Sequence, residues 1–379
     1  LVYRMRATFE VAHVLDRSWH CVEKDTLNGW QIRTLRAIKD CRTIALGGHV
    51  DGCDSCGHVQ ISYNSCRNRH CPKCQGHKRQ QWIEARETEL LPVPYFHVVF
   101  TLPDTLNPYA IHKPKVIYDA LFQAAWETIE AFAGKKNKAG MISILHTWGQ
   151  NLSLHPHIHC IIPGGTVDQN GKWKLSKSSG KFLYPVKAMS KIYRAKYVAI
   201  LRASELEIEQ STFDALFKKE WVVYAKRPFG SPKSVVEYLG RYTHKIAISN
   251  HRILSIDDHT VRISYKDYRT EGQKKTMTLS HAEFIRRFAL HILPKRFVRI
   301  RHYGILSSSW KPNKLPNLQA VLTALPIRLL PTGIKHPKAQ SCPCCKTGRI
   351  ITIMTFGRRG PPSEYNKAAY ENPTSQKSC

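Results

Sequence analysis

Acidic residues are scarce in this sequence, and long apolar runs are missing. The 379 residues include 28 Asp and Glu against 58 Lys and Arg, which gives a formal net charge of +30. An excess of this size indicates a polyanionic partner rather than a surface charged only for solubility. No stretch of about 18 consecutive apolar residues, no basic amphipathic helix and no secretory signal is visible, so we expect a cytoplasmic protein without a membrane partner.

A disulfide framework is also missing, although the sequence holds 12 cysteines. They include Cys-x-x-Cys pairs, which favour metal binding in a reducing compartment when no secretory signal is visible. Cys53 and Cys56 are followed, after fourteen intervening residues, by Cys71 and Cys74. We predict that these four thiolates form one structural Zn²⁺ site of the zinc-ribbon or treble-clef type, and that the metal folds a module with few apolar residues.

Other residues near these pairs leave the exact ligands open. Cys41, Cys66 and His70 are close enough in sequence to replace one of the four. The segment Cys342-Pro343-Cys344-Cys345 offers another knuckle without an evident partner pair; half of a second zinc site, an interchain site and plain structural cysteines all fit it. Basic residues around the first module favour DNA contact over a purely structural role. The predicted contacts there are Arg67, Arg69 and Lys73.

Residues 154–165 contain the pattern with the clearest chemistry. The two-residue period of a strand places His157 and His159 on one face, while Ile158, Cys160 and Ile162 form an apolar back. Two imidazoles projecting from a buried strand suit a divalent metal ion, because neutral imidazole is a common ligand and the strand fixes both rings. The plain alternative is a half-buried strand whose histidines are only hydrogen-bonded.

A third ligand is expected on the preceding strand, residues 141–150. The short connection after it predicts an antiparallel hairpin with the histidine strand. Gln150 and His146 share a face by parity, so either residue is a candidate third ligand, and the sequence does not choose between them.

Tyr238 and Tyr242 are four residues apart in a predicted helix that begins at Ser231 and Pro232. They therefore lie one turn apart on the same helix face. An isolated pair of this kind would be expected to pack in a core, but beside a metal-binding strand in a basic chain we interpret it as functional. Further predicted DNA contacts are Arg241, Lys245, Arg299 and Arg301. The last two belong to a basic and aromatic strip, residues 296–303, that can hold single-stranded nucleic acid by charge and stacking; a solvated face is the competing interpretation.

The element pattern predicts an α+β fold. We divide the chain into a helical and zinc-binding domain (1–92), a catalytic domain (93–310) and a basic, Pro-rich C-terminal region (311–379). The predicted strands are residues 95–102, 141–150, 154–165, 221–225, 246–249, 261–265 and 275–279. The predicted helices are residues 26–38, 107–133, 185–206 and the one that Ser280 and Glu283 begin with a capping box, and a hairpin turn is predicted at Asn170-Gly171.

Four segments together carry a resemblance to a known family: residues 65–74 (SCRNRHCPKC), 145–150 (LHTWGQ), 155–159 (HPHIH) and 238–244 (YLGRYTH). With these motifs the chain resembles the rolling-circle transposases of the insertion sequence 91 family, the two-tyrosine members of the HUH endonucleases. The resemblance implies an HUH endonuclease-type central antiparallel sheet flanked by helices, preceded by a small zinc-ribbon-like domain. It places the metal-binding pair on His157 and His159, and the two nucleophiles on Tyr238 and Tyr242.

The resemblance also implies the reaction. A phenol has a pKa near 10 in water, so the site must favour the phenolate or accept its proton. A divalent ion, Mg²⁺ or Mn²⁺, would bind the scissile phosphate and withdraw charge. Attack by a tyrosine on single-stranded DNA at the element's ends and target then gives a 5′-phosphotyrosine and a free 3′ hydroxyl. The implied location is the bacterial cytoplasm, in association with the nucleoid, and no small-molecule substrate is expected.

Two rival functions fit parts of the pattern. A non-catalytic zinc-ribbon DNA-binding protein would use the histidines for a structural metal and would form no covalent adduct. A metal-dependent nuclease would activate water, and its cleavage would survive the loss of both tyrosines. Neither rival accounts for the tyrosine pair, and we therefore expect a transposase.

Overall fold

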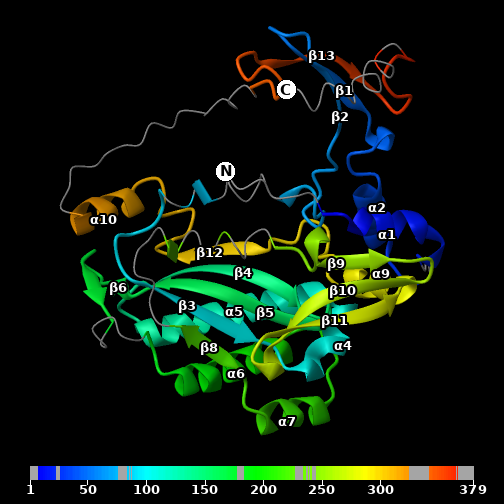
Figure 1. The fold of residues 1–379 in the computed structure, drawn as a ribbon. Helices are drawn as coiled ribbons and strands as arrows, with labels where there is room; N and C mark the ends of the chain where they lie inside the picture. Colours follow the sequence, from blue (N-terminus) through cyan, green and yellow to red (C-terminus); the bar gives the residue numbers. More distant parts are fainter. Residues whose placement is uncertain are drawn as a thin grey trace.

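The computed structural model describes residues 7–22, 26–75, 83–84, 86, 88–176, 183–226, 234–235, 238, 240, 245–323, 341–363 and 365. These residues form a mixed helical and antiparallel structure (Figure 1), as the sequence predicts. Within this described part, no helix is long and apolar enough to cross a membrane.

A five-stranded sheet lies at the centre of the fold, and the histidine strand is its middle strand. The strand order is β12 (Ile300–Gly304), β4 (Gly140–Trp148), β5 (Leu154–Pro163), β3 (Tyr95–Thr101) and β8 (Val223–Lys226). Every neighbouring pair is antiparallel. The predicted central antiparallel sheet is confirmed, and its middle position gives β5 a partner on both sides.

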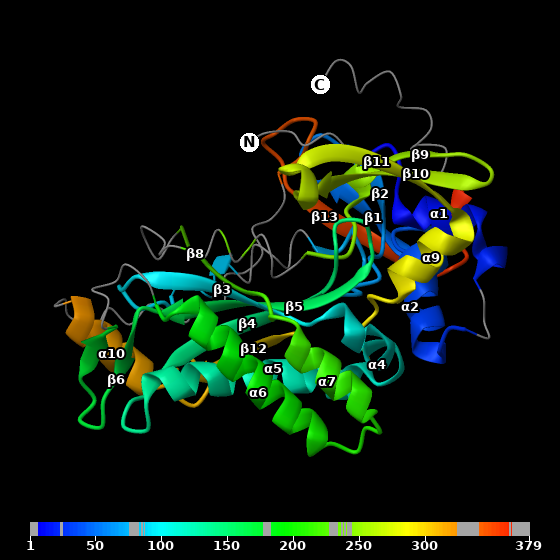
Figure 2. The same ribbon diagram turned by 90° about the horizontal axis from the view of Figure 1, so that it is seen from below.

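Helices cover one face of this sheet (Figure 2). They are α4 (Asn107–His112), α5 (Pro114–Ala133), α6 (Val186–Arg202) and α7 (Gln210–Lys218). The covered face presents alternate residues of β3 and β5, such as Phe100, Ile158 and Cys160, which are fully buried in the largest apolar cluster. Because strand side chains alternate, the histidines of β5 point to the opposite face.

A second sheet packs against the N-terminal helices (Figure 1). It consists of β9 (Ile253–Ile256), β10 (Thr260–Asp267) and β11 (Gln273–Ser280), followed by α9 (His281–Ala289). Its apolar residues share one buried cluster with α1 (Val11–Arg17) and α2 (Gly29–Lys39). The predicted helix over 26–38 is confirmed as α2, which begins at an Asn28 and Gln31 capping box.

The predicted strand over 246–249 is wrong. This segment forms no strand; Ala247 and Ile248 are instead buried in the cluster beneath the second sheet. The guanidinium of Arg252 holds the loop by donating to the carbonyl oxygens of Ala247 and Ser264. Burial of an apolar pair in a loop produces the same sequence pattern as a short strand, which explains the error.

A third sheet pairs a strand of the C-terminal region with two strands of the N-terminal region. Its order is β13 (Ile350–Phe356), β1 (Gly48–Cys53) and β2 (Val59–Tyr63), all antiparallel. Figure 1 shows the red β13 beside the blue β1 and β2. The sequence did not predict β13, and it left the C-terminal region as a separate unit.

The remaining elements complete the outline. The hairpin predicted at Asn170-Gly171 is confirmed, because β6 (Gly165–Val167) pairs with β7 (Trp173–Leu175) around it. Ser280 accepts a hydrogen bond from the amide of Glu283 at the start of α9, as the capping pattern predicts. Further elements are α10 (Lys314–Thr323) and the 3₁₀ turns η1 (Trp19–Cys21), η2 (Ile44–Leu46), η3 (Asp104–Leu106), η4 (Asn250–Arg252) and η5 (Tyr268–Thr270).

Candidate active site and zinc centres

Three histidines gather on the uncovered face of the central sheet. His146 of β4 is the direct cross-strand partner of His157 of β5, and His159 follows two residues later on the same face. One ring nitrogen of each lies within 4.8 Å of the others. The predicted pair is therefore brought together, and His146 is the candidate third ligand that lies with it.

Burial of His157 and His159 keeps their imidazoles neutral. His146 and His159 are buried, and burial lowers the pKa of His159 well below its ordinary value. Burial also lowers the pKa of His157 to about 4. Nδ1 of His157 lies 2.7 Å from the carbonyl oxygen of His155, to which only a protonated Nδ1 can donate. Its Nε2 then carries the lone pair that a metal ion needs.

Gln150, the other candidate, lies beyond the end of β4, in the turn. The β4–β5 register shifts between His146 and Trp148, so that β5 has one more residue than β4 in this stretch. Pro156 lies in the longer segment, and a bulge is where a strand accommodates proline. Gln150 and His146 were predicted to share a face because strand side chains alternate. Since β4 ends at Trp148, that alternation does not extend to Gln150.

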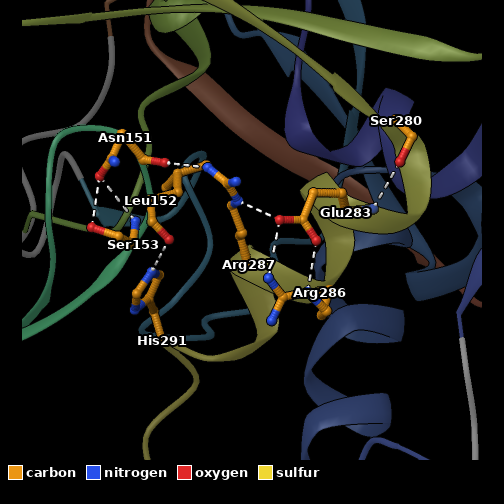
Figure 3. A network of polar contacts seen from close by, with 8 residues as sticks. All are labelled: Asn151, Leu152, Ser153, Ser280, Glu283, Arg286, Arg287 and His291. Atoms are coloured by element: carbon orange, nitrogen blue, oxygen red, sulfur yellow. Dashed lines mark hydrogen bonds and ion pairs between the residues drawn. The ribbon is translucent and has the colours of Figure 1, made fainter. Parts of the chain in front are cut away.

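The hairpin turn that follows His146 is fixed by α9 (Figure 3). Arg287 donates to the carbonyl oxygen of Asn151 and is paired with Glu283 at 2.6 Å. His291 lies 3.1 Å from the carbonyl oxygen of Leu152, whose φ of 63° is in the left-handed region. These bonds hold the connection between the two strands that carry the histidine cluster.

His97 is a site residue that our sequence reasoning missed. It pairs with Ile161 across β3 and β5, which places its ring on the histidine face. Nε2 of His97 lies 2.9 Å from Nδ1 of His159. The signal in the sequence was a single imidazole inside an otherwise apolar strand, Tyr95-Phe96-His97-Val98-Val99-Phe100.

Tyr238 lies on the other side of His97. Its hydroxyl is 3.3 Å from Nδ1 of His97, and the two rings meet edge to face with centroids 5.0 Å apart. Val235, one helical turn earlier, is fully buried in an apolar cluster that includes Tyr95 and Ile161 of the central sheet. The predicted nucleophile Tyr238 therefore stands next to the histidine cluster, whereas Tyr242 and the predicted contact Arg241 are outside the described residues.

The first zinc centre has a different ligand set from the predicted one. Cys71 and Cys74 lie with Cys41 and Cys66, and the four sulfur atoms are within 4.8 Å of one another. Sγ of Cys74 is 3.6 Å from the sulfur of both Cys41 and Cys66. Such a set of four thiols is typical of structural zinc. It packs in the same apolar cluster as α1 and α2.

The predicted site of Cys53, Cys56, Cys71 and Cys74 is therefore wrong in its grouping. Cys53 and Cys56 lie at the far end of the β1–β2 hairpin, together with Cys342 and Cys345. Strand β2, which lies between Cys56 and Cys71 in the sequence, carries the first pair away from the second. The C-terminal knuckle, for which the sequence offered no partner pair, lies beside Cys53 and Cys56.

The predicted DNA contacts fall into two groups. Arg67 and Lys245 have exposed side chains, and Lys245 is close enough to His157 and His159 to lower their pKa values through its charge. Four of the others, apart from Arg241, make contacts that hold parts of the described fold together. Arg69 donates to the carbonyl oxygens of Pro294 and Phe297, and Lys73 pairs with Glu10 at 2.6 Å. Arg299 is buried and donates to the carbonyl oxygen of Lys245. Arg301 pairs with Asp119, and its guanidinium lies over the Phe122 ring.

Comparisons with known proteins match both halves of the chain. A family model described as "Transposase zinc-binding domain" matches residues 14–102, and one described as "Putative transposase" matches residues 140–314. The chain is 41% identical over 390 residues to the "Putative transposase y4qJ" of Sinorhizobium fredii, across 93% of this chain and 97% of the relative. It is 29% identical over 327 residues to the "Transposase for insertion sequence element IS801" of Pseudomonas savastanoi pv. phaseolicola, across 80% of this chain and 77% of the relative.

Among solved structures, the conjugative relaxase TrwC in complex with oriT DNA is similar over a limited part. The identity is 13% and the TM-score is 0.25, with 41% of this chain and 66% of that chain covered.

Proposed function

This chain belongs to the insertion sequence 91 family of transposases, and on that premise we propose how it handles DNA. It cleaves and rejoins single-stranded DNA through a 5′-phosphotyrosine on Tyr238 or Tyr242. The observation that carries the proposal is the position of the Tyr238 hydroxyl, one imidazole away from a cluster of three histidines. A phenol in this place has both a neighbouring hydrogen-bonding group and a metal-binding cluster, which are the two aids that a weak nucleophile needs.

The histidine cluster fits a divalent ion. His146, His157 and His159 supply three nitrogen ligands from rigid strands, and the other positions of an ion would stay open for phosphate oxygens. When bound, Mg²⁺ or Mn²⁺ supplies Lewis-acid stabilisation of the charge that develops on the scissile phosphate. The same imidazoles also accept Zn²⁺.

The hydrogen bonds around His97 support a defined arrangement of protons. If Nε2 of His159 is the ligand atom, the proton of that neutral ring is on Nδ1, which then donates to Nε2 of His97 at 2.9 Å. The proton of His97 is in turn on Nδ1, and it points to the Tyr238 hydroxyl at 3.3 Å. An N–H donor at that oxygen stabilises the phenolate over the phenol. We therefore propose that His97 is a positioning residue that favours the nucleophilic form of Tyr238.

Two tyrosines allow two successive transfers. Tyr242 follows Tyr238 by four residues, the sequence spacing of one helical turn, and a second nucleophile at that spacing would serve the other end of a displaced strand. The stored phosphotyrosine bond allows rejoining without ATP. We propose that Tyr242 accepts the second strand end.

Binding of DNA follows from the family and from the charge, and we propose that the bound form is single-stranded. Lys245 is exposed beside the histidines, where it can hold the phosphate next to the scissile one. Arg67 lines a polar groove of about 1400 Å³ together with Arg42 and Lys73, and this groove is our candidate path for flanking DNA. Such an enzyme would work in the cytoplasm, in association with the nucleoid.

We propose that the chain is divided into three regions. A boundary near residue 92 separates the zinc-binding module from the catalytic sheet, and one near residue 310 ends the catalytic part. Contacts cross both boundaries, since α2 packs beside α9 and β13 pairs with β1. We therefore propose that the three regions 1–92, 93–310 and 311–379 fold in dependence on one another.

The test is the formation of a covalent adduct. Purified protein is incubated with single-stranded DNA carrying the element's end and Mn²⁺ or Mg²⁺, and the products are separated on a denaturing gel. We expect a protein–DNA band that is lost in the Tyr238→Phe/Tyr242→Phe variant and on chelation. Cleavage without an adduct would support the water-activating nuclease, and binding without cleavage would support the non-catalytic DNA-binding protein.

A further inference from the structure

Four cysteine sulfurs converge where the β1–β2 hairpin approaches the segment before β13. Cys53 and Cys56 come from the β1–β2 hairpin, and Cys342 and Cys345 come from the segment before β13. All four sulfur atoms lie within 4.8 Å of one another. Sγ of Cys53 is 3.7 Å from Sγ of Cys345, and Sγ of Cys56 is 3.7 Å from Sγ of Cys342.

These separations match a metal tetrahedron. With Zn–S bonds of about 2.3 Å, the sulfur atoms of a tetrahedral site are about 3.8 Å apart. A disulfide would bring a pair to about 2.05 Å. The cysteines are free thiols, and their spacing is that of ligands around one ion.

Backbone amides point at the sulfur atoms from both knuckles. The amide of Ser55 donates to Sγ of Cys53 at 3.4 Å, and the amide of Cys344 donates to Sγ of Cys342 at 3.4 Å. The amide of Gly348 donates to Sγ of Cys345 at 3.2 Å. Donors of this kind stabilise thiolates, which are the form that binds metal.

Gly348 shows how closely the two knuckles approach. A Cβ atom at this position would lie 2.4 Å from Sγ of Cys53. The next residue, Arg349, donates its amide to a carboxylate oxygen of Asp54 at 2.8 Å. The C-terminal turn is therefore in direct contact with the N-terminal knuckle.

The three-stranded sheet buries few apolar side chains. Val50 is the fully buried apolar side chain of β1, and β13 has only half-buried or exposed side chains. Ile351 and Ile353 of β13 are 53% and 50% exposed. A sheet with so small an apolar interior needs another source of folding free energy, and a structural metal supplies it in small modules.

We propose that Cys53, Cys56, Cys342 and Cys345 bind a second structural Zn²⁺, which fastens the C-terminal strand β13 onto the N-terminal hairpin. The C-terminal pair lies outside both ranges that the transposase family models match. The chain then contains two zinc ions held by thiolates alone. This inference is independent of the cleavage mechanism, because no residue of the histidine cluster takes part.

The experiment counts zinc per chain in the full-length protein. To keep the histidine cluster from contributing, all variants carry His157→Ala and His159→Ala, and zinc is measured by inductively coupled plasma mass spectrometry. We expect two zinc ions in this parent and one in Cys342→Ser/Cys345→Ser. Cys53→Ser/Cys56→Ser should also hold one, and the combination of all four substitutions should still hold one, because both pairs serve the same ion.

Cys344 provides the matched control. It lies between two of the ligands but is not part of the four-sulfur group, so Cys344→Ser should retain two zinc ions. Cys66→Ser/Cys71→Ser should lose the other ion and keep the second. One zinc in the parent, or two in Cys342→Ser/Cys345→Ser, would overturn the proposal.

A second measurement tests the proposal in case the serine variants fail to fold. Cys345→His keeps four ligands, so the zinc content and the fold should remain. After exchange of zinc for Co²⁺, the thiolate-to-cobalt charge-transfer absorption should fall by about one part in eight, since seven thiolates remain of the eight in two four-thiolate sites. Cys344→His should leave that absorption unchanged. An unchanged spectrum in Cys345→His would show that Cys345 binds no metal.

Discussion

The hydroxyl of Tyr238 lies 3.3 Å from Nδ1 of His97, and the opposite nitrogen of that ring lies 2.9 Å from His159. One imidazole thus connects the nucleophile proposed on a helix with the metal ligand proposed on the central strand. The connection depends on three elements that are far apart in sequence. Because His97 is not one of the proposed metal ligands, its role can be tested separately from metal binding.

Replacement of His97 should slow adduct formation more than it affects the fold. His97→Leu removes the N–H donor next to Tyr238 and should reduce the rate of adduct formation at saturating metal by roughly 10- to 100-fold, equivalent to about 1.4–2.7 kcal/mol. His97→Asn places an amide NH₂ near the position of Nδ1 and should retain more of the rate. The measurement is single-turnover kinetics on the single-stranded substrate. Equal losses in the two variants would contradict a hydrogen-bonding role.

The third metal ligand is tested by comparing His146 with Gln150. His146→Ala should weaken Mn²⁺ binding by about 100-fold or more, because outer partners of metal ligands alone are worth 10–100-fold. Gln150→Ala should change the affinity little, since Gln150 lies beyond the register shift that follows His146. Isothermal titration of the full chain with Mn²⁺ measures both. The reverse order of the two effects would assign the ligand to Gln150.

Acid should destabilise the protein through buried histidines. His291 is 3% exposed, and burial lowers its pKa to about 4. Its pKa in the unfolded chain is about 6.5, so the unfolded state binds more protons between those values and stability is lost as the pH falls from about 6.5 to 4. At pH 5 this one group should cost about 2 kcal/mol relative to pH 7.5.

The check is urea unfolding at pH 7.5 and 5.0. His291→Gln lacks the titrating ring, so its free energy of unfolding should fall by about 2 kcal/mol less than that of the parent over this range. The parent and the variant should be compared in the same metal-free buffer. An identical pH dependence in both proteins would show that His291 titrates normally in the folded state.

Replacement of Lys245 should weaken DNA binding, whereas replacement of Arg301 should lower the stability of the fold. Lys245→Ala should weaken binding of single-stranded DNA and reduce the slope of log affinity against log salt concentration by about 0.7, the value for one phosphate contact. Arg301→Ala should lower stability instead, because Arg301 pairs with Asp119 and lies over the Phe122 ring. Lys172→Ala, in an exposed turn, is the matched control. Fluorescence anisotropy at several salt concentrations gives the slopes.

The histidine strand was predictable because its information is local. The two-residue alternation of His157 and His159 with apolar neighbours fixes both the strand and its two faces. The hairpin with β4 follows from the short connection, and it brings His146 into reach. His97 could not be placed in the same way, because a lone imidazole in β3 gains its meaning only from the strand order β4-β5-β3.

The grouping of the zinc ligands, in contrast, could not be predicted from local sequence. Sequence spacing favours Cys53 and Cys56 as partners of Cys71 and Cys74, but strand β2 runs between the two pairs and separates them in space. Their true neighbours include Cys342, almost three hundred residues away, and no local pattern reports that approach. The same limit applies to Arg299, whose charge predicts a surface contact although its side chain is buried.

The most direct measurement of the central claim is to locate the covalent bond. Protein is reacted with single-stranded DNA bearing the element's end in the presence of Mn²⁺, digested with nuclease and protease, and analysed by tandem mass spectrometry. Our account predicts a nucleotide attached through its 5′ phosphate to Tyr238 or Tyr242, absent when the ion is chelated. Attachment to another residue, or cleavage with both tyrosines unmodified, would contradict it.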